Sequence, residues 1–292
     1  MTDTATTDTA TTDTATRSLA GKTLFITGAS RGIGLAIATR AARDGARIVL
    51  VAKTVEPNPR LPGTLASAAA QIEAAGGEAL IAPTDIRDEN AIAGAVRDAL
   101  ERFGGIDILV NNASAISLTS TPETPMKRFD LLFDVDVRGT FACTQACLAA
   151  LTRSADSGGN PHVLNLSPPL SLDPRWFAPH VAYTMAKYGM SMCTLGHAPE
   201  FRNRGIAVNS LWPRTLIATA ALQMIPGLDH RRARTPQIVA EAAWWILTSD
   251  ARAVTGNFFI DEALLAQHGV TDLDRFSVEP GTRDLLQDLF VD

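Results

Sequence analysis

The chain has 292 residues, of which 46% are hydrophobic and 20% are charged, so it is long enough for one large domain with a substantial core. Its formal net charge is −5 and no block of like charge stands out, which argues against nucleic acid as a partner. No run of about 18 apolar residues occurs, so we expect no membrane span. The three cysteines lack a paired metal-type spacing, which predicts no metal site and favours a reducing compartment such as the cytoplasm.

The first 17 residues form a low-complexity repeat, MTDTATTDTATTDTATR. The repeat contains no hydrophobic stretch of the kind that secretory signals need, and it cannot bury apolar surface. We therefore expect residues 1–17 to be a disordered tail that takes no part in the fold.

Beyond the tail, apolar runs alternate with segments of helical spacing. Seven short apolar runs predict strands, at 23–28, 47–53, 78–85, 106–113, 162–167, 206–213 and 256–261. The segments between them predict helices, at 32–46, 64–77, 89–105, about 126–151, the stretch after 180, and 237–249. Strands that are apolar on both faces and alternate with helices indicate a parallel sheet covered on both sides.

The predicted fold is therefore α/β, a doubly wound Rossmann-type parallel sheet of about seven strands with helices on both faces. Ligands of this fold bind beyond the carboxyl ends of the strands. We expect one such domain over residues 18–262. Residues 263–292 are then expected to form a C-terminal arm that packs on the same domain or on a neighbouring subunit.

A glycine-rich turn, TGASRGIG, joins the first strand to the first helix. Glycine allows a tight turn and lets backbone amides approach a pyrophosphate, and the helix that follows presents its positive N-terminus there. The turn alone is a weak signal, but its place after the first strand of an alternating pattern predicts a dinucleotide site. The cofactor-binding residues expected in this turn are Gly28, Ser30, Arg31, Gly32, Ile33 and Gly34.

The second strand carries the signal for the type of nicotinamide cofactor. An acidic residue at its end would bind the ribose 2′-hydroxyl of NAD, but this strand ends in Ala52 and Lys53. Two cations, Arg31 and Lys53, suit a 2′-phosphate, so the sequence favours NADP (NADPH), although both could be solvated surface charges. Asp85 ends the third strand, and Asn112 and Ala113 end the fourth. They are expected to hold the adenine and close the cofactor pocket.

A tyrosine and a lysine four residues apart, Tyr183 and Lys187, lie on the helix that follows the fifth strand. Residues at i and i+4 share one face of a helix, and a nearby ammonium group lowers the pKa of a phenol. We expect Tyr183 to exchange a proton with a substrate oxygen while hydride moves to or from the cofactor. Chance spacing on an amphipathic helix is the competing reading. The glycine turn upstream favours chemistry.

The elements TGASRGIG, NNAS and YTMAK, in this order, resemble the short-chain dehydrogenase/reductase superfamily over residues of about 20–262. The stretches LNLSPPLSLDPRWF and HVAYTMAKYGMSMC resemble its hydroxysteroid-dehydrogenase-like branch, whose animal members are peroxisomal and carry a C-terminal sterol-carrier domain. We expect that domain to be absent here. Because the chain ends in FVD rather than a peroxisomal signal, we expect a cytoplasmic location.

The resemblance implies a catalytic serine before Tyr183, and this sequence departs from the pattern there. The family's spacing puts Leu170 at the serine position, and alignment on the fifth strand puts Pro168 there. Ser167 and Ser171 are the neighbouring candidates. We favour Ser167 as the third catalytic residue, and either serine could be a turn residue only.

Two further positions differ from the family pattern. Asp136 stands where the family has asparagine, whose backbone carbonyl leads through water to the lysine. A backbone role survives the change, or the carboxylate pairs with Lys187. After the sixth strand the family's Pro-Gly reads Pro213-Arg214. Pro213, with a threonine beyond it, Thr215 or Thr219, is expected near the nicotinamide amide.

The predicted function is an NADP-dependent oxidoreductase that transfers hydride between nicotinamide and a carbonyl or hydroxyl substrate. Trp176, Phe177 and the segment 215–235 contribute apolar side chains near the expected site, which suits an acyl or steroid-like small molecule. Arginines in that segment could meet an anion such as coenzyme A, or form a solvated face. The alternative is a non-catalytic NADP-binding sensor or scaffold. By resemblance, we also expect a homodimer or homotetramer.

Overall fold

The computed structural model describes residues 17–292 except 59–61, 221 and 223–226. Most of the predicted tail, and parts of the segment 215–235, therefore lie outside the described residues. Seven parallel strands form one sheet in the order β3-β2-β1-β4-β5-β6-β7, which confirms the predicted Rossmann-type topology. The strands are β1 (Thr23–Thr27), β2 (Arg47–Ala52), β3 (Glu78–Pro83), β4 (Ile108–Asn111), β5 (His162–Asn165), β6 (Ala207–Trp212) and β7 (Phe258–Ile260).

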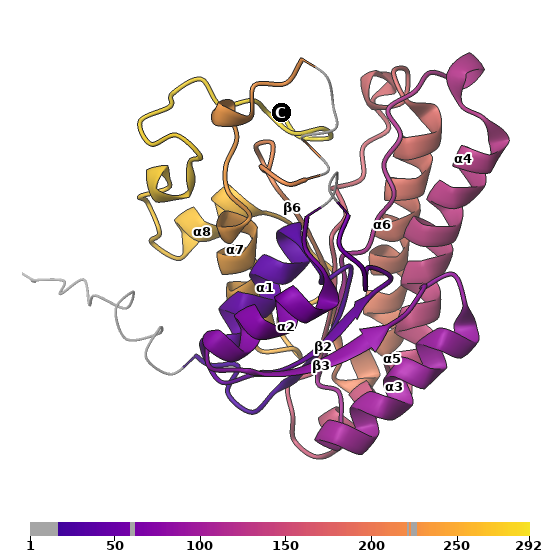
Figure 1. The fold of residues 1–292 in the computed structure, drawn as a ribbon, viewed down its shortest axis with the longest axis vertical. Helices are drawn as coiled ribbons and strands as arrows, with labels where there is room; N and C mark the ends of the chain where they lie inside the picture. The colour runs from indigo at the N-terminus through magenta and orange to yellow at the C-terminus, as the bar shows by residue number, and fades with distance from the viewer. Residues whose placement is uncertain (1–16, 59–61, 221, 223–226) are drawn as a thin grey trace, which may run out of the picture.

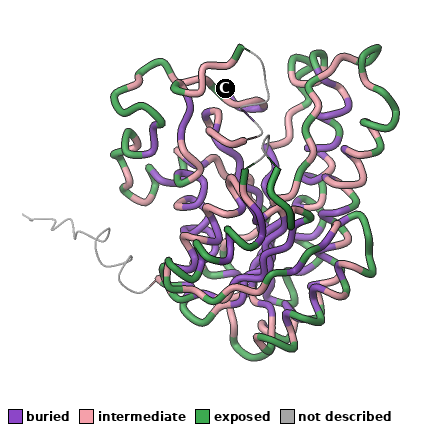
Figure 2. The backbone as a smooth tube through the Cα atoms, viewed as in Figure 1, coloured by how far each residue is buried: buried purple, intermediate pink, exposed green. Residues whose placement is uncertain are grey.

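Helices cover both faces of the sheet (Figure 1). One side carries α1 (Gly32–Ala42), α2 (Leu65–Ala74), α7 (Gln237–Leu247) and α8 (Asp261–Gln267). The other side carries α3 (Glu89–Phe103), α4 (Met126–Leu132), α5 (Gly139–Asp156) and α6 (Val181–Phe201). Each side of the sheet packs against its helices in a hydrophobic core. Successive residues of β1 point to opposite sides, so Leu24 and Ile26 pack in the first core, with α1, and Phe25 packs in the second core, with α3. Figure 2 shows the buried backbone concentrated along this sheet.

The predicted helix over about 126–151 is divided into three pieces. A π-helical segment, Phe133–Arg138, separates α4 from α5. Extra residues of this kind within helices are frequent at functional sites, and here the segment contains Asp136, which is fully buried. Helical periodicity alone did not indicate the interruption.

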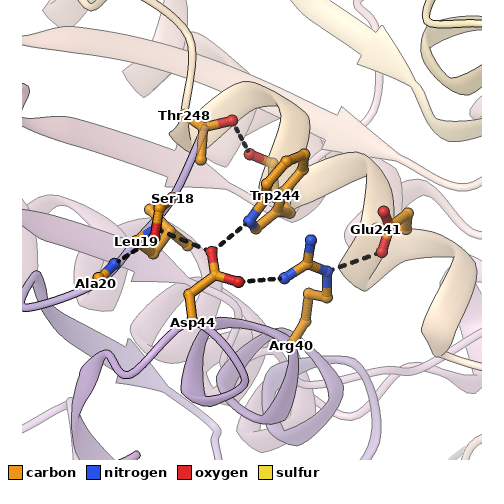
Figure 3. A network of polar contacts seen from close by, with 8 residues as sticks. All are labelled: Ser18, Leu19, Ala20, Arg40, Asp44, Glu241, Trp244 and Thr248. Carbon is orange, nitrogen blue, oxygen red and sulfur yellow. Dashed lines mark hydrogen bonds and ion pairs between the residues drawn. The ribbon is translucent and has the colours of Figure 1, made fainter. Parts of the chain in front are cut away.

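A polar network connects α1 to α7 on the side of the sheet that carries α1, α2, α7 and α8 (Figure 3). The Asp44 carboxylate accepts hydrogen bonds from the Trp244 indole at 2.7 Å and from the backbone of Leu19 at 2.9 Å. Arg40 pairs with Asp44 at 3.0 Å and with Glu241 at 2.9 Å, and its guanidinium lies 4.3 Å from the Trp244 ring centroid. These contacts fix the helix that begins at the glycine turn.

The C-terminal part of the chain packs on the same chain's sheet. Helix α8 begins at Asp261, so the boundary expected at 262/263 falls within a helix. The last residues then return to the carboxyl edge of the sheet, where Gln287 forms an antiparallel bridge with Thr215. The Trp212 indole donates a hydrogen bond to the Leu289 carbonyl at 2.8 Å. None of the described helices is long and apolar enough to cross a membrane.

Candidate active site

The glycine turn between β1 and α1 packs closely against the residues that follow β4. Gly28 and Gly32 have positive φ angles of 67° and 59°. A Cβ atom on Gly28 would lie 2.8 Å from Asn112 Nδ2 and 2.9 Å from the Cα of Ala113. The Asn112 amide in turn donates to the carbonyls of Thr27 at 2.8 Å and Gly28 at 3.2 Å. Asn112 therefore holds the shape of the turn from the neighbouring strand.

A cavity of about 840 Å³ opens beside this turn, at the carboxyl edge of β1, β2 and β4. That size is in the range of cofactor and small-molecule sites. The cavity continues along the stretch 114–119 that follows β4. The predicted cofactor residues that line it are Gly28, Ser30, Arg31, Gly32, Ile33, Lys53, Asp85, Asn112 and Ala113.

The two predicted cations, Arg31 and Lys53, lie on the wall of this cavity. Arg31 donates to both carbonyls of residues 62–63, at 3.1 and 2.8 Å. Lys53 is 60% exposed, and its Nζ lies 3.8 Å from the Asp85 carboxylate. Arg87, which the sequence analysis did not single out, bonds Asp85 at 2.6 Å and holds the pKa of that carboxyl at about 2. Asp85 is thus ionised, and both of the predicted cations remain at the cavity wall.

Tyr183 and Lys187 both lie on α6 and are both buried, with 6% and 3% of their surface exposed. The Lys187 ammonium donates to the Leu166 carbonyl at 2.8 Å, just beyond β5. It also lies 5.0 Å from the centroid of the Trp212 ring, at the end of β6. Burial lowers the pKa of Lys187, while the nearby Asp136 acts in the opposite direction.

The charge environment of Tyr183 includes acidic neighbours as well as Lys187. Burial raises the pKa of Tyr183 well above its ordinary value of 10, and the carboxylates of Asp136 and Asp288 raise it further. The expectation that Lys187, together with an oxidised nicotinamide nearby, favours the tyrosinate stays a prediction, and burial is the largest effect on this side chain in the structure. At neutral pH Tyr183 is a phenol, which can donate a proton.

Asp136 uses its side chain as well as its backbone. The carboxylate accepts hydrogen bonds from the Ala115 amide at 2.7 Å and from the Ser114 hydroxyl at 3.0 Å. Burial raises its pKa from 3.8 to about 6, against the opposing effects of Lys187 and of these hydrogen bonds. Asp136 thus fixes the segment that follows β4, on the wall of the cavity, and faces the Tyr–Lys pair.

Ser167 lies in a buried polar network rather than at the cavity. It is fully buried, and its hydroxyl lies 2.9 Å from that of Ser210 on β6. The network continues through Thr194, 2.7 Å from Ser210, and Asn165, which donates to Thr194 at 2.8 Å. Asn111 donates to Asn165 at 2.9 Å. This placement gives Ser167 a structural partner, and its expected catalytic role remains a prediction.

The alternative serine, Ser171, lies half-buried on the loop between β5 and α6. Its hydroxyl accepts a hydrogen bond from the Asp173 amide at 3.2 Å, as a turn residue does. Pro168 is buried, and its carbonyl accepts from the Ser191 hydroxyl at 2.6 Å. Among the described contacts, the structure therefore brings neither serine to the Tyr183 hydroxyl.

Thr215 and Pro213 both lie buried just after β6. The Thr215 hydroxyl oxygen is buried and has no hydrogen-bond partner among the residues that the structure describes. Such an unsatisfied hydroxyl is costly and suits a ligand that supplies the missing bond. Thr219, the other candidate threonine, lines the cavity. Arg214, in place of the family's glycine, donates from its backbone to Asp261 at 2.9 Å.

The arginines of the segment 215–235 are engaged with neighbouring acids. Each has a carboxylate partner, at 2.8 Å for Arg231 with Asp229, 2.6 Å for Arg232 with Asp284 and 2.7 Å for Arg234 with Glu262. The charge of each of these arginines is therefore balanced by a carboxylate of the protein, and no anionic ligand is needed to explain them.

Two residues near the Tyr–Lys pair were missed in the sequence analysis. Phe290 is 4% exposed, and its ring centroid lies 6.2 Å from that of Tyr183. Asp288 is close enough to Lys187 for the two charges to interact, while burial raises its pKa to about 7. Both lie about 100 residues after Lys187 in the chain, and no local pattern in the sequence connects them to the site.

Comparisons with known proteins agree with this geometry. The family model for short chain dehydrogenases matches residues 22–226. Hydroxysteroid dehydrogenase-like protein 2 is 57% identical in Xenopus tropicalis and 52% in Homo sapiens, each over 94% of this chain. The chain spans 64% of the length of both relatives.

Solved structures show the same fold. A putative dehydrogenase from Xanthomonas campestris has 54% identity and a TM-score of 0.89, covering 95% of this chain and 99% of its own. A metagenomic short-chain oxidoreductase in complex with NADP has 27% identity and a TM-score of 0.68, covering 83% and 97%. From the fold, the glycine turn, the Tyr–Lys pair and these matches, the chain belongs to the short-chain dehydrogenase family.

Proposed function

We propose that the chain is an NADP-dependent oxidoreductase that transfers hydride between nicotinamide and an apolar, acyl or steroid-like carbonyl or hydroxyl substrate. The observation that carries the proposal is the buried Tyr183–Lys187 pair on α6, at the same edge of the sheet as the glycine turn. The relatives named hydroxysteroid dehydrogenase-like protein 2 support it by similarity, as does the structural neighbour in complex with NADP.

The residues present fit a dinucleotide in two ways. Asn112 and Ala113 lie so close to Gly28 that a side chain there would collide with them, and Gly28 lines the cavity with backbone atoms alone, as a pyrophosphate site requires. The Thr215 hydroxyl, which has no hydrogen-bond partner among the described residues, suits a carboxamide. When bound there, a nicotinamide cofactor supplies or accepts the hydride.

The proton is handled by the chain's own residues. Tyr183 is protonated at neutral pH, so in carbonyl reduction its Oη–H bond breaks and the proton goes to the substrate oxygen. The Lys187 ammonium, held by the Leu166 carbonyl, then faces the phenolate that remains and stabilises it.

Preference for NADP follows from the charges on the cavity wall. Arg31 and Lys53 line it, and no acidic residue directly follows β2. A matched test titrates NADPH and NADH by nicotinamide fluorescence in wild type and in the Arg31→Ala/Lys53→Ala variant. We expect NADPH affinity to fall by more than about tenfold in the variant and NADH affinity to change little. Equal losses for both nucleotides would refute the 2′-phosphate assignment.

The catalytic assignment is tested by Tyr183→Phe, which removes one oxygen atom. With NADPH and a panel of apolar aldehydes and ketones, we expect turnover to fall by about 10³-fold or more while NADPH affinity stays the same. Turnover equal to that of wild type would refute the role of Tyr183.

A non-catalytic NADP-binding sensor or scaffold is the second candidate. It is favoured by one observation, that Tyr183 is only 6% exposed while Ser167, the expected helper, is fully buried. Tight NADPH binding without turnover of any panel substrate would support the sensor.

We also propose a homodimer or homotetramer in the cytoplasm. The outer faces of α5 and α6 expose large apolar side chains, which is typical of an interface. They are Phe141, Met185, Met192 and Leu195, exposed by 43% to 60%. Light scattering should give a mass of two or four chains, and a monomer mass at micromolar concentration would refute this.

A further inference from the structure

An aromatic slot lies beside Tyr183, and the side chain of Phe290 fills it. The slot is built from the loop before α6, from α6 itself and from the end of β6, so three separate segments converge on one ring. Ring centroids of the slot lie within 6.2 Å of that of Phe290: Trp176 at 5.8 Å, His180 at 6.1 Å, Tyr183 at 6.2 Å, Tyr188 at 5.4 Å and Trp212 at 5.9 Å.

Phe290 occupies space that the proposed reaction needs. A proton passes from Tyr183 to a substrate oxygen only when the two atoms lie within about 2.6–3.2 Å. The groups attached to the reacting carbon must then lie next to the Tyr183 ring, where Phe290 now packs. The cavity described above borders Ala113 and the stretch 114–119, and Tyr183 is not among its lining residues. Phe290 is not among them either, so Tyr183 and the ring that packs on it both lie beyond the lining of this cavity.

The segment that carries Phe290 has a strained backbone at that residue. Phe290 has φ of +68°, and it is the one non-glycine residue with positive φ among the described residues. A bulky side chain is disfavoured there. The segment is held by the Trp212–Leu289 hydrogen bond, by the backbone hydrogen bonds of Leu286 and Asp288, and by exposed contacts of Asp292 with Arg175 and Arg214. The strain at Phe290 offsets part of the stability that its buried ring supplies, which lowers the free energy needed to displace the ring.

We propose that the aromatic slot is the subsite for a ring-sized apolar group next to the reacting carbonyl, and that Phe290 is its internal occupant until substrate displaces it. The inference rests on the proposed function. The substrates that suit the slot are ketones, aldehydes or alcohols that carry a flat or cyclic hydrocarbon group, because aromatic walls at ring-to-ring distance stack on such groups.

The first test measures ligand binding in the slot directly and does not depend on catalytic turnover. The protein contains four tryptophans, two in the slot and two, Trp244 and Trp245, on α7. In protein labelled with 5-fluorotryptophan, acetophenone is the probe, and ¹⁹F resonances report on each indole. We expect saturable shifts at Trp176 and Trp212 and none at the α7 pair. Absence of shifts at the slot tryptophans would overturn the proposal.

Phe290→Gly then tests the occupant. Glycine tolerates the positive φ and removes the ring, so we expect acetophenone to bind at least about tenfold more tightly than to wild type. The matched control is Phe276→Gly, which removes a similarly buried ring of the C-terminal region that packs in the first core instead. It should leave probe affinity unchanged. Equal affinity in Phe290→Gly and wild type would overturn the role of Phe290.

Hydrogen exchange in the wild type keeps the test independent of how the variant folds. The amides of Leu286 and Asp288 donate to the carbonyls of Arg232 and Arg214 at 2.8 and 3.0 Å. Displacement of Phe290 by acetophenone should speed exchange at both amides, and slower exchange would contradict displacement.

Failure of the slot and failure of the proposed function are distinguishable. Probe binding without NADPH-dependent turnover would sustain the slot and refute the enzyme. NADPH-dependent turnover without any shift at the slot tryptophans would refute the slot and support the enzyme.

Discussion

Replacing Asp136 with asparagine should stabilise the protein, and more so at alkaline pH. The Asp136 carboxyl is fully buried within the π-helical segment, between the stretch after β4 and the Tyr–Lys pair on α6. Asparagine has nearly the same shape, and its oxygen can accept from the Ala115 amide while its NH₂ group donates to the Ser114 hydroxyl. The substitution therefore removes a buried charge and keeps both hydrogen bonds.

The magnitude follows from the pKa of Asp136. Burial raises it from 3.8 to about 6, even with the attraction of Lys187 included. At about 1.4 kcal/mol per pKa unit, ionised Asp136 costs the folded state about 3 kcal/mol as an upper estimate. A raised carboxyl pKa means that the cost is absent below pH 3.8, grows as the pH rises, and is complete above about pH 6. The gain from Asp136→Asn should follow the same curve.

The assay is urea unfolding of wild type and Asp136→Asn across pH 4.5 to 8. We expect the variant to be more stable by about 1–3 kcal/mol at pH 8, with the difference shrinking towards pH 4.5. Asp134→Asn is the matched control, because Asp134 lies in the same π-helical segment but is half-buried. It should show no pH-dependent gain. A variant that is less stable than wild type at pH 8, or equally favoured at all pH values, would refute the reasoning.

Two further predictions concern hydroxyl groups. Thr215→Val should weaken NADPH binding about three- to tenfold without lowering the free energy of unfolding, because the buried Thr215 hydroxyl lacks a partner among the described residues. Calorimetric titration measures the affinity and thermal melts measure the stability. A clear loss of stability would contradict this prediction. Ser167→Ala should destabilise by about 1–2 kcal/mol because it breaks one buried hydrogen bond, and Ser210→Ala should destabilise more because its hydroxyl bonds both Ser167 and Thr194. Measuring turnover in both variants separates the roles of the two serines. A loss of at least about 10²-fold in Ser167→Ala but not in Ser210→Ala would establish Ser167 as the catalytic hydroxyl. The same turnover in the two variants would show that Ser167 has a structural role.

The parts of the site that depend on neighbours in sequence were predictable. The glycine turn, the alternation of apolar runs with helical segments, and the i, i+4 spacing of Tyr183 and Lys187 are each local patterns. Parallel topology brings the ends of β1, β2 and β4 to one edge, so the cavity lining at Arg31, Lys53 and Asn112 followed from the fold class. The resemblance to the family rests on these same residues.

Other features depend on where distant segments meet, and only the tertiary structure decided them. The sequence could not place Ser167 against Ser210, because Ser167 follows β5, Ser210 lies on β6, and the two are 43 residues apart. It did not indicate the π-helical break that buries Asp136, nor that Phe290 would fill a slot built by α6 and β6. The pKa of Tyr183 shows the physical reason. Spacing brings a lysine near it, but burial sets the energy of its charged form, and burial is a sum over contacts from the whole chain.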